Sequence, residues 1–211
     1  MARDLFVVTH AQATHHIEGV VGGWHDSELT PLGRRQAEAI ATRIGELTAG
    51  AAVEVWSSDL KRAAQTAAPI CAQLGVEARL TPGLREKSFG VAGGRPVAWL
   101  DEHWRPTAPD DCRLDHPEGV DGAETRRDLM TRVTAAMDEI TARDCPVQII
   151  VTHGFALTFV IAAWFRLPVE SAGWIGFRPL SGGITHLQQD DRFRDRSLLS
   201  FNEQAHLAGV S

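Results

Sequence analysis

Short apolar runs alternate with helical patterns along this chain. Residues 5–8 and 147–151 are almost continuously apolar, which is typical of strands that are buried on both faces of a sheet. The other apolar runs are shorter or contain more polar residues. Together the pattern predicts six strands, at residues 5–8, 51–56, 76–80, 147–151, 184–188 and 197–201.

Between the strands, apolar side chains recur at helical spacing. Thr30 followed by Pro31 is typical of a helix start, because threonine can cap the first turn and proline fits the first helical position. Further helices are expected at residues 60–74, 129–140 and 154–165, the last of them apolar and packed against the sheet. This alternation predicts an α/β fold: a three-layer sandwich with a mostly parallel central sheet and helices on both faces.

The helix at residues 60–74 carries two specific predictions. Ser57, Ser58 and Asp59 are candidates for its N-cap, since each has a side-chain oxygen that can accept a hydrogen bond from a free backbone N–H. Pro69 lies inside the helical pattern and is expected to kink or shorten the helix, because it lacks an N–H and clashes with the preceding turn.

Two segments show no regular pattern. Residues 11–29 are expected to form a Gly-rich loop, and residues 87–121 a loop-rich insertion over the active site without a core of its own. A chain of 211 residues is long enough for one sizeable core. No linker or repeat divides it, so we expect a single domain over residues 1–211.

Composition narrows the class of protein. The apolar and charged fractions, 44% and 23%, are those of an ordinary globular protein, and no run approaches the ~20 apolar residues of a membrane span. A net charge of −6 argues against nucleic acid as a partner. Three cysteines without metal-ligand spacing, and an apolar run too short for a signal peptide, favour the cytoplasm.

Two histidines each follow a predicted strand: His10 follows the first, and His153 follows the run at 147–151. Arg62 comes shortly after the strand at 51–56, at the start of a helix. Because the carboxyl ends of parallel strands meet at one sheet edge, these side chains are expected to converge there. A neutral imidazole is a competent nucleophile, a guanidinium binds phosphate oxygens, and a helix N-terminus such as Gly154 favours an anion. The pattern predicts phosphoryl transfer on histidine.

Five segments in order resemble the histidine phosphatase superfamily, which includes the cofactor-dependent phosphoglycerate mutases. They are Gly23–Gly33, Ser57–Ala67, Leu84-Arg85-Glu86, Thr152-His153-Gly154 and Phe201–Leu207. The resemblance implies that His10 is the phosphorylated nucleophile, that Arg62 and His153 bind phosphate, and that Glu86 protonates the leaving oxygen. It implies no metal and no cofactor.

The chain departs from the family at its first motif. Where the family has Arg-His-Gly, this chain has Thr9-His10-Ala11, and His16 stands where an asparagine is common. Thr9 and His16 are therefore expected to line the phosphate site in place of a guanidinium and an amide. A lost charge-assisted contact costs about 1.5–3 kcal/mol, or roughly 10–150-fold in binding or rate.

These residues favour a metal-independent phosphomonoester hydrolase that acts on a small phosphorylated substrate. Three alternatives stay open: a weak or inactive phospho-ligand binder on the same fold, a phosphoglycerate mutase, and a metal-dependent hydrolase using His10, His15, His16 and His153. The short, mixed-charge insertion favours hydrolysis over the mutase. A homodimer is also left open, and the pair Arg126-Arg127 is interpreted as a solvated helix face.

Overall fold

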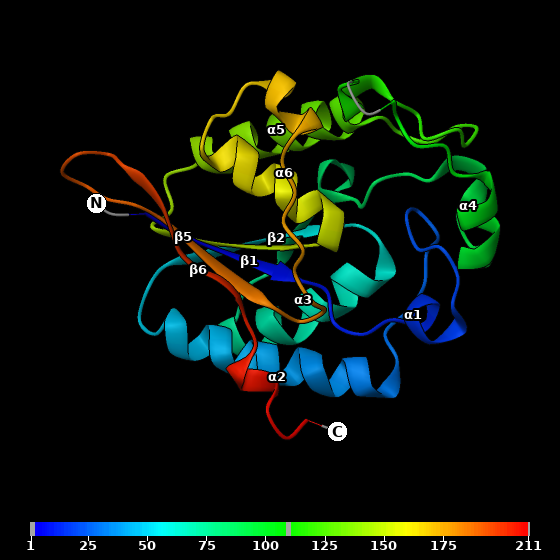
Figure 1. Cartoon of the computed structure of the whole chain (residues 1–211). Helices are drawn as coiled ribbons and strands as arrows, with labels where there is room; N and C mark the ends of the chain where they lie inside the picture. The colour runs from blue at the N-terminus through cyan, green and yellow to red at the C-terminus, as the bar shows by residue number, and fades with distance from the viewer. Residues whose placement is uncertain (1–2, 109–110, 211) are drawn as a thin grey trace.

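The computed structural model describes residues 3–108 and 111–210 (Figure 1). The predicted domain limits, residues 1 and 211, and two residues of the 87–121 insertion lie outside these ranges. No helix in the described ranges is long and apolar enough to cross a bilayer.

One six-stranded sheet forms the centre of the protein. Its strands are β1 (Arg3–Thr9), β2 (Val53–Ser58), β3 (Ala78–Thr81), β4 (Val147–Thr152), β5 (Ile184–Gln189) and β6 (Arg196–Glu203). They lie in the order β3-β2-β4-β1-β5-β6. The pairs β1–β4, β2–β4 and β2–β3 are parallel, and β5 runs antiparallel to both of its neighbours.

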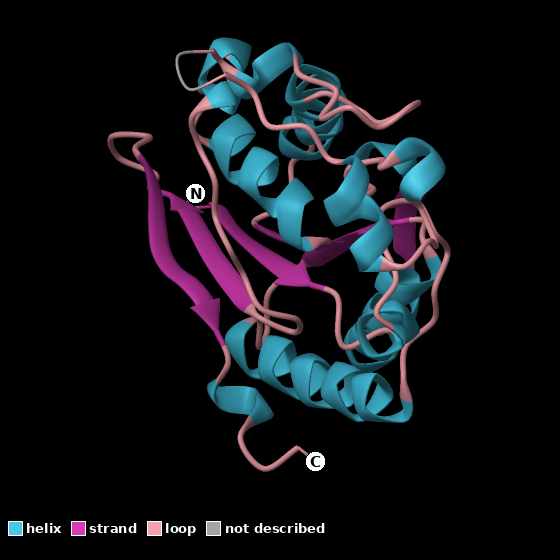
Figure 2. Cartoon of the chain, turned by 45° about the vertical axis from the view of Figure 1, so that its right-hand side comes forward, coloured by secondary structure: helices cyan, strands magenta, loops and turns pink. Residues whose placement is uncertain are grey.

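Four long helices cover the two faces of this sheet (Figure 2). Side chains alternate along β1, so Phe6 and Val8 pack toward α2 (Pro31–Leu47) and α3 (Lys61–Leu74). Leu5 and Val7 pack toward α5 (Arg126–Ala142) and α6 (Gly154–Trp164) on the opposite face. The predicted α/β three-layer sandwich is confirmed.

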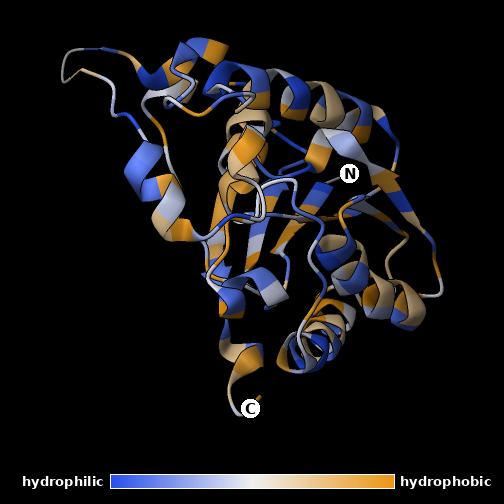
Figure 3. Cartoon of the chain, turned by 90° about the vertical axis from the view of Figure 1, so that its right-hand side faces the viewer, coloured by the Kyte–Doolittle hydropathy of each residue, from blue (hydrophilic) through white to orange (hydrophobic). Residues whose placement is uncertain are grey.

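Hydrophobic and hydrophilic residues alternate along the long helices, as in helices with one buried face (Figure 3). Helix α6 differs, because eight of its eleven residues are buried. It follows β4, which is buried along its whole length, and the two form the most apolar part of the sequence. This buried pair fixes the position of His153, the residue between them.

The predicted cap of α3 is wrong, and the predicted shortening at Pro69 does not occur. The helix runs without a break from Lys61 to Leu74, so Pro69 does not shorten it. Its first N–H is satisfied from a distant loop, because the amide of Lys61 donates to Oδ1 of Asp26 at 2.8 Å. Asp59 instead binds the Arg85 guanidinium through two hydrogen bonds of 2.7 and 2.6 Å.

The two irregular segments are more ordered than their sequences indicate. The 11–29 loop contains α1 (Thr14–Glu18), and the 87–121 insertion contains α4 (Val97–His103). A small apolar cluster of Val21, Ala92 and Val120 joins the two segments. The insertion therefore packs against the first loop through this shared cluster.

Candidate active site

A cavity of about 230 Å³ opens where β1, β2 and β4 end, and we call it the strand-end cavity. Six of the seven predicted site residues line it: Thr9, His10, His16, Arg62, Glu86 and Gly154. His153, the seventh, is fully buried beside it, with its ring centroid 5.0 Å from that of His10. The tertiary structure thus brings all seven together, although they come from four distant parts of the chain.

His10 is held in one tautomer by its own backbone. Its Nδ1 lies 2.8 Å from the carbonyl oxygen of Ala11, which can only accept, so Nδ1 carries the proton. Nε2 is therefore the atom with a free electron pair. Burial, followed by the nearby Arg62 charge, lowers the pKa of His10 well below its usual value, and the imidazole is neutral at physiological pH. A neutral, oriented imidazole is what nucleophilic attack requires.

Arg62 is only 1% exposed and is fixed by three hydrogen bonds. Its Nη1 and Nη2 donate to the carbonyls of His25 and Gly23 at 2.8 and 2.7 Å, and its Nε donates to His10 Nε2 at 3.2 Å. Gly23 presents its carbonyl from a left-handed backbone conformation, with φ +50°, that few other residues adopt. Burial lowers the pKa of Arg62 to about 10, so the group stays charged at neutral pH.

His153 is oriented by a residue that the sequence suggested only as a helix cap. Its Nε2 lies 2.8 Å from Oγ of Ser58, at the end of β2, while its Nδ1 is buried without a partner. Burial, with Arg62 and then His10 nearby, lowers the pKa of His153 well below its usual value. The site therefore combines two neutral imidazoles with one guanidinium. Among the described residues that line the strand-end cavity, Arg62 is the only lysine or arginine.

Glu86 contacts the N-terminus of α6. Its carboxylate accepts hydrogen bonds from the amides of Phe155 and Ala156, at 3.1 and 3.0 Å, and from its own neighbour Lys87 at 2.9 Å. These amides belong to the helix end that was expected to hold phosphate next to Gly154. The Glu86 carboxylate therefore already occupies two of the amides at this helix terminus.

Two residues that sequence reasoning missed fix the backbone of Glu86. Trp24 Nε1 and Arg132 Nη2 donate to its carbonyl oxygen at 2.8 and 2.7 Å. Arg132 also donates to the carbonyls of Gly83 and Arg85 and pairs with Glu124. An arginine in the middle of an amphipathic helix gives no signal of such a role, because it depends on which loop packs against the helix.

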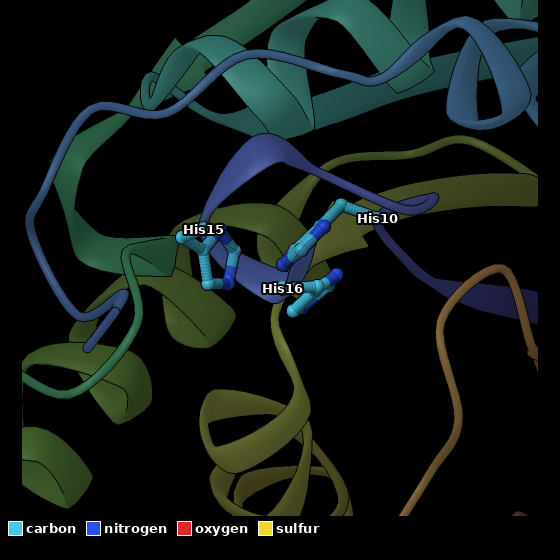
Figure 4. A group of neighbouring side chains, drawn as sticks. All are labelled: His10, His15 and His16. Atoms are coloured by element: carbon cyan, nitrogen blue, oxygen red, sulfur yellow. The ribbon is translucent and has the colours of Figure 1, made fainter. Parts of the chain in front are cut away.

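Thr9 and His16, the two departures from the family's first motif, have distinctive surroundings. Thr9 is buried and its Oγ1 has no hydrogen-bond partner. His16 lies over His10, with ring centroids 5.6 Å apart and planes 10° from parallel (Figure 4). The Ala13 amide donates to His16 Nδ1 at 3.2 Å, so Nε2 of His16 carries the proton and is available as a donor. This is a suitable arrangement for contacting a phosphate oxygen.

Three imidazoles, those of His10, His15 and His16, are close enough together to suggest a metal site, with one nitrogen from each within 4.8 Å of the others (Figure 4). Their chemistry does not fit a cation. His10 Nε2 accepts from Arg62, and His16 Nδ1 accepts from a backbone amide. The Arg62 charge also faces the group and would repel a cation. A phosphate anion suits these neighbours better.

The chain is similar to two proteins named as probable phosphoglycerate mutases. The chain is 32% identical over 187 residues to a probable phosphoglycerate mutase GpmB of Shigella boydii, covering 84% of this chain and 82% of that protein. A Yersinia enterocolitica protein with the same name is 32% identical over 174 residues, covering 78% and 76%.

Solved structures give the same picture. A mycobacterial glucosyl-3-phosphoglycerate phosphatase superposes with a TM-score of 0.77 at 28% identity, covering 97% of this chain and all of that one. The YhfR protein of Bacillus stearothermophilus shares the fold, with a TM-score of 0.77 at 22% identity, over 97% of this chain and 99% of that one. The family model for the histidine phosphatase superfamily (branch 1) matches residues 5–202. The chain belongs to the histidine phosphatase superfamily.

Proposed function

We propose that this protein is a metal-independent phosphomonoester hydrolase that works through a phosphohistidine on His10. The observation that carries the proposal is the tautomer of His10. Its Nδ1–H is bound to the Ala11 carbonyl, and this leaves the Nε2 electron pair in a cavity lined by Arg62 and Glu86, beside the buried His153. No single one of these residues indicates the reaction, but their convergence does.

The first step transfers the phosphoryl group to His10. Nε2 attacks phosphorus, the bond from phosphorus to the leaving oxygen breaks, and Glu86 donates a proton to that oxygen. The Arg62 Nε–H now bound to His10 Nε2 must release it, and it then donates to a phosphate oxygen. His153, whose Nδ1 has no partner, stabilises charge on the transferring group.

The second step regenerates the enzyme. The Glu86 carboxylate takes a proton from water, the water oxygen attacks phosphorus, and the bond to His10 Nε2 breaks to release inorganic phosphate. The Phe155 and Ala156 amides support the charged form of Glu86 in this step. In the first step, Glu86 is protonated and gives this proton to the leaving oxygen.

Two related functions compete with this proposal. Relatives named as probable mutases favour a mutase, whereas a structural neighbour named as a phosphatase and the short insertion at 87–121 favour hydrolysis. A non-catalytic phospho-ligand binder is favoured by Thr9, which brings no charge to the cavity. We propose net hydrolysis of a small phosphorylated substrate by a cytoplasmic protein. The homodimer, the absence of nucleic-acid and membrane partners, and the single domain stay predictions.

The test is a panel of phosphate esters assayed in EDTA, covering phenyl phosphate, sugar phosphates, phosphoglycerates, nucleotides and phosphoamino acids. Release of inorganic phosphate, with an acid-labile phosphate on the wild-type protein that His10→Ala lacks, is the expected result. Phosphate moving between hydroxyls of a phosphoglycerate without net release would favour the mutase. Binding of inorganic phosphate without any turnover would favour the non-catalytic phospho-ligand binder. Loss of activity in EDTA would favour a metal-dependent hydrolase.

A further inference from the structure

A second and larger cavity, of about 630 Å³, adjoins the strand-end cavity. The two are contiguous along the chain at two places, because Gly154 and Pro179 line the first while Phe155 and Arg178 line the second. The amide of Phe155 also donates to Glu86, the proposed acid. Phe155 therefore links the proposed acid to the wall of the second cavity.

The second cavity is rich in guanidinium groups, and we call it the arginine cavity. Arg113, Arg126 and Arg178 line it, and Asp111 is the one carboxylate among the described lining residues. Arg113 lies 3.5 Å from Glu118, a moderate ion pair. Within the described residues, Arg126 and Arg178 form no ion pair, so the cavity keeps an excess of positive charge.

Arg126 is the most unusual of the three. The sequence suggested a solvated helix-face residue, but its side chain is only 6% exposed. Nη1 donates to the carbonyls of Ala172 and Ile175, each at 3.0 Å, and Nε has no partner. Burial, followed by the charge of Arg113, lowers the pKa of Arg126. Burying a cation without a carboxylate partner is costly, so an anion bound beside Arg126 would offset part of that cost.

The walls of the arginine cavity are partly aromatic. Phe155 lies under the Arg126 guanidinium, with 5.2 Å from Cζ to the ring centroid, and Phe177 also lines the wall. Trp174, on the same loop, is 71% exposed, which is unusual for so large an apolar side chain. A flat or apolar body can lie on these rings while an anionic group reaches the guanidinium groups.

We infer that the preferred substrates carry a second anionic group on the leaving group, bound in the arginine cavity on an aromatic wall. The substrate class is then a phosphate monoester of an alcohol or phenol that itself carries a carboxylate or a second phosphate. Both groups accept the two parallel N–H bonds that a guanidinium offers. This inference rests on the hydrolase proposed above and specifies which esters it prefers.

The experiment compares phenyl phosphate with the three isomeric carboxyphenyl phosphates and with the corresponding phenylene bisphosphates. These esters share a ring and differ in the second anion and in its distance from the phosphate ester. We expect kcat/KM for the best dianionic ester to exceed that for phenyl phosphate about 10-fold or more, in line with one charge-assisted contact. The carboxylate and bisphosphate arms show which anion is preferred.

Arg178→Gln is the main variant, because Arg178 is exposed and its replacement does not disturb the core. It should reduce the preference for the second anion, measured as the ratio of kcat/KM for the best dianionic ester to that for phenyl phosphate, about 10-fold. Arg126→Lys tests the buried site with the charge retained. Arg127→Gln is the matched control, since Arg127 follows Arg126 on α5 but pairs with Asp115 outside this cavity. It should leave the preference unchanged.

The outcomes separate the two proposals. Turnover of phenyl phosphate without any preference for a second anion, or a preference that survives Arg178→Gln and Arg126→Lys unchanged, overturns the inference and leaves the hydrolase standing. If none of the esters is hydrolysed, the hydrolase itself is wrong, and the inference is overturned with it.

Discussion

The strand-end cavity and the arginine cavity adjoin each other but are built in opposite ways. The reacting groups of the strand-end cavity are held at strand ends and helix starts, and the imidazoles of His10 and the adjacent His153 are neutral and buried. The arginine cavity comes from the insertion, the loop that contains Trp174, and the starts of α5 and α6, and three of its lining residues are arginines. Regular strands fix atoms precisely enough for chemistry on a phosphoryl group, whereas loops can vary to suit a leaving group.

This contrast leads to a general expectation. Changes in the strand-end cavity should alter turnover of every phosphate ester by a similar factor, since the phosphoryl group is common to all of them. Changes in the arginine cavity should alter only the ranking of esters. A substitution in either cavity that behaves in the other way would break the comparison.

The largest effect is expected for His10→Ala. Removing the nucleophile should lower kcat by about 10⁴-fold or more for all esters, because the covalent step has no replacement. Stopped assays of inorganic phosphate with phenyl phosphate and with a carboxyphenyl phosphate measure this. An equal loss on both esters is expected, and residual turnover within 10-fold of wild type would mean that another residue is the nucleophile.

Glu86→Gln should lower kcat by about 10²–10⁴-fold on esters of alkyl alcohols, because the leaving alkoxide needs a proton. The loss should be much smaller on 4-nitrophenyl phosphate, whose leaving group departs without one. Parallel assays of the two esters give the ratio. An equal loss on both would show that Glu86 supports the fold of this site and is not the acid. Thermal denaturation of the variant checks that contribution, since Glu86 also caps α6.

Thr9→Arg should tighten inhibition by inorganic phosphate by about 10-fold, because it restores a guanidinium beside His10. Thr9 lines the cavity and its hydroxyl has no partner to lose. The inhibition constant against phenyl phosphate is the measurement, and Thr9→Met controls for added volume without charge. Weaker or unchanged inhibition would indicate that His16 already supplies the missing contact.

The smallest effect concerns stability. The pKa values of His10 and His153 are lowered in the folded protein, so the unfolded chain binds more protons as the pH falls below about 6.5. The free energy of unfolding should therefore decrease by about 1.4 kcal/mol per pH unit for each histidine below that pH. Urea denaturation between pH 7 and pH 5 measures the slope. His153→Asn should reduce this slope by the contribution of one histidine. An unchanged slope would contradict the neutral state of His153.

The sequence predicted the core of this protein well and its local details less well. Six strands and four long helices appear close to their expected positions, because burial on both faces leaves continuous apolar runs at β1 and β4. Shorter elements such as α1 and α4 were missed, since five to seven residues carry little periodicity. The cap of α3 was misplaced because its acceptor, Asp26, is 35 residues away in the chain.

The candidate site likewise contains residues that the sequence predicted and contacts that it could not predict. His10, Arg62 and His153 could be found from the sequence because each follows a strand whose end lies on a known sheet edge. The contacts of Ser58, Trp24 and Arg132 with the site could not, because each contact joins segments that only packing brings together. The tautomer of His10 was also beyond the sequence, since it depends on a single 2.8 Å contact with a backbone carbonyl.

By itself, the sequence determined the layered fold, the sheet edge where chemistry-bearing residues gather, and the residue types that point to phosphohistidine chemistry. The tertiary structure alone decided which nitrogen of His10 carries a proton, that Glu86 binds the amides at the start of α6, and that Arg126 is buried beside a second cavity. The physical reason is the separation along the chain of the residues that interact. Apolar periodicity is a local property of the chain, whereas hydrogen bonds and buried charges depend on groups that meet only after folding.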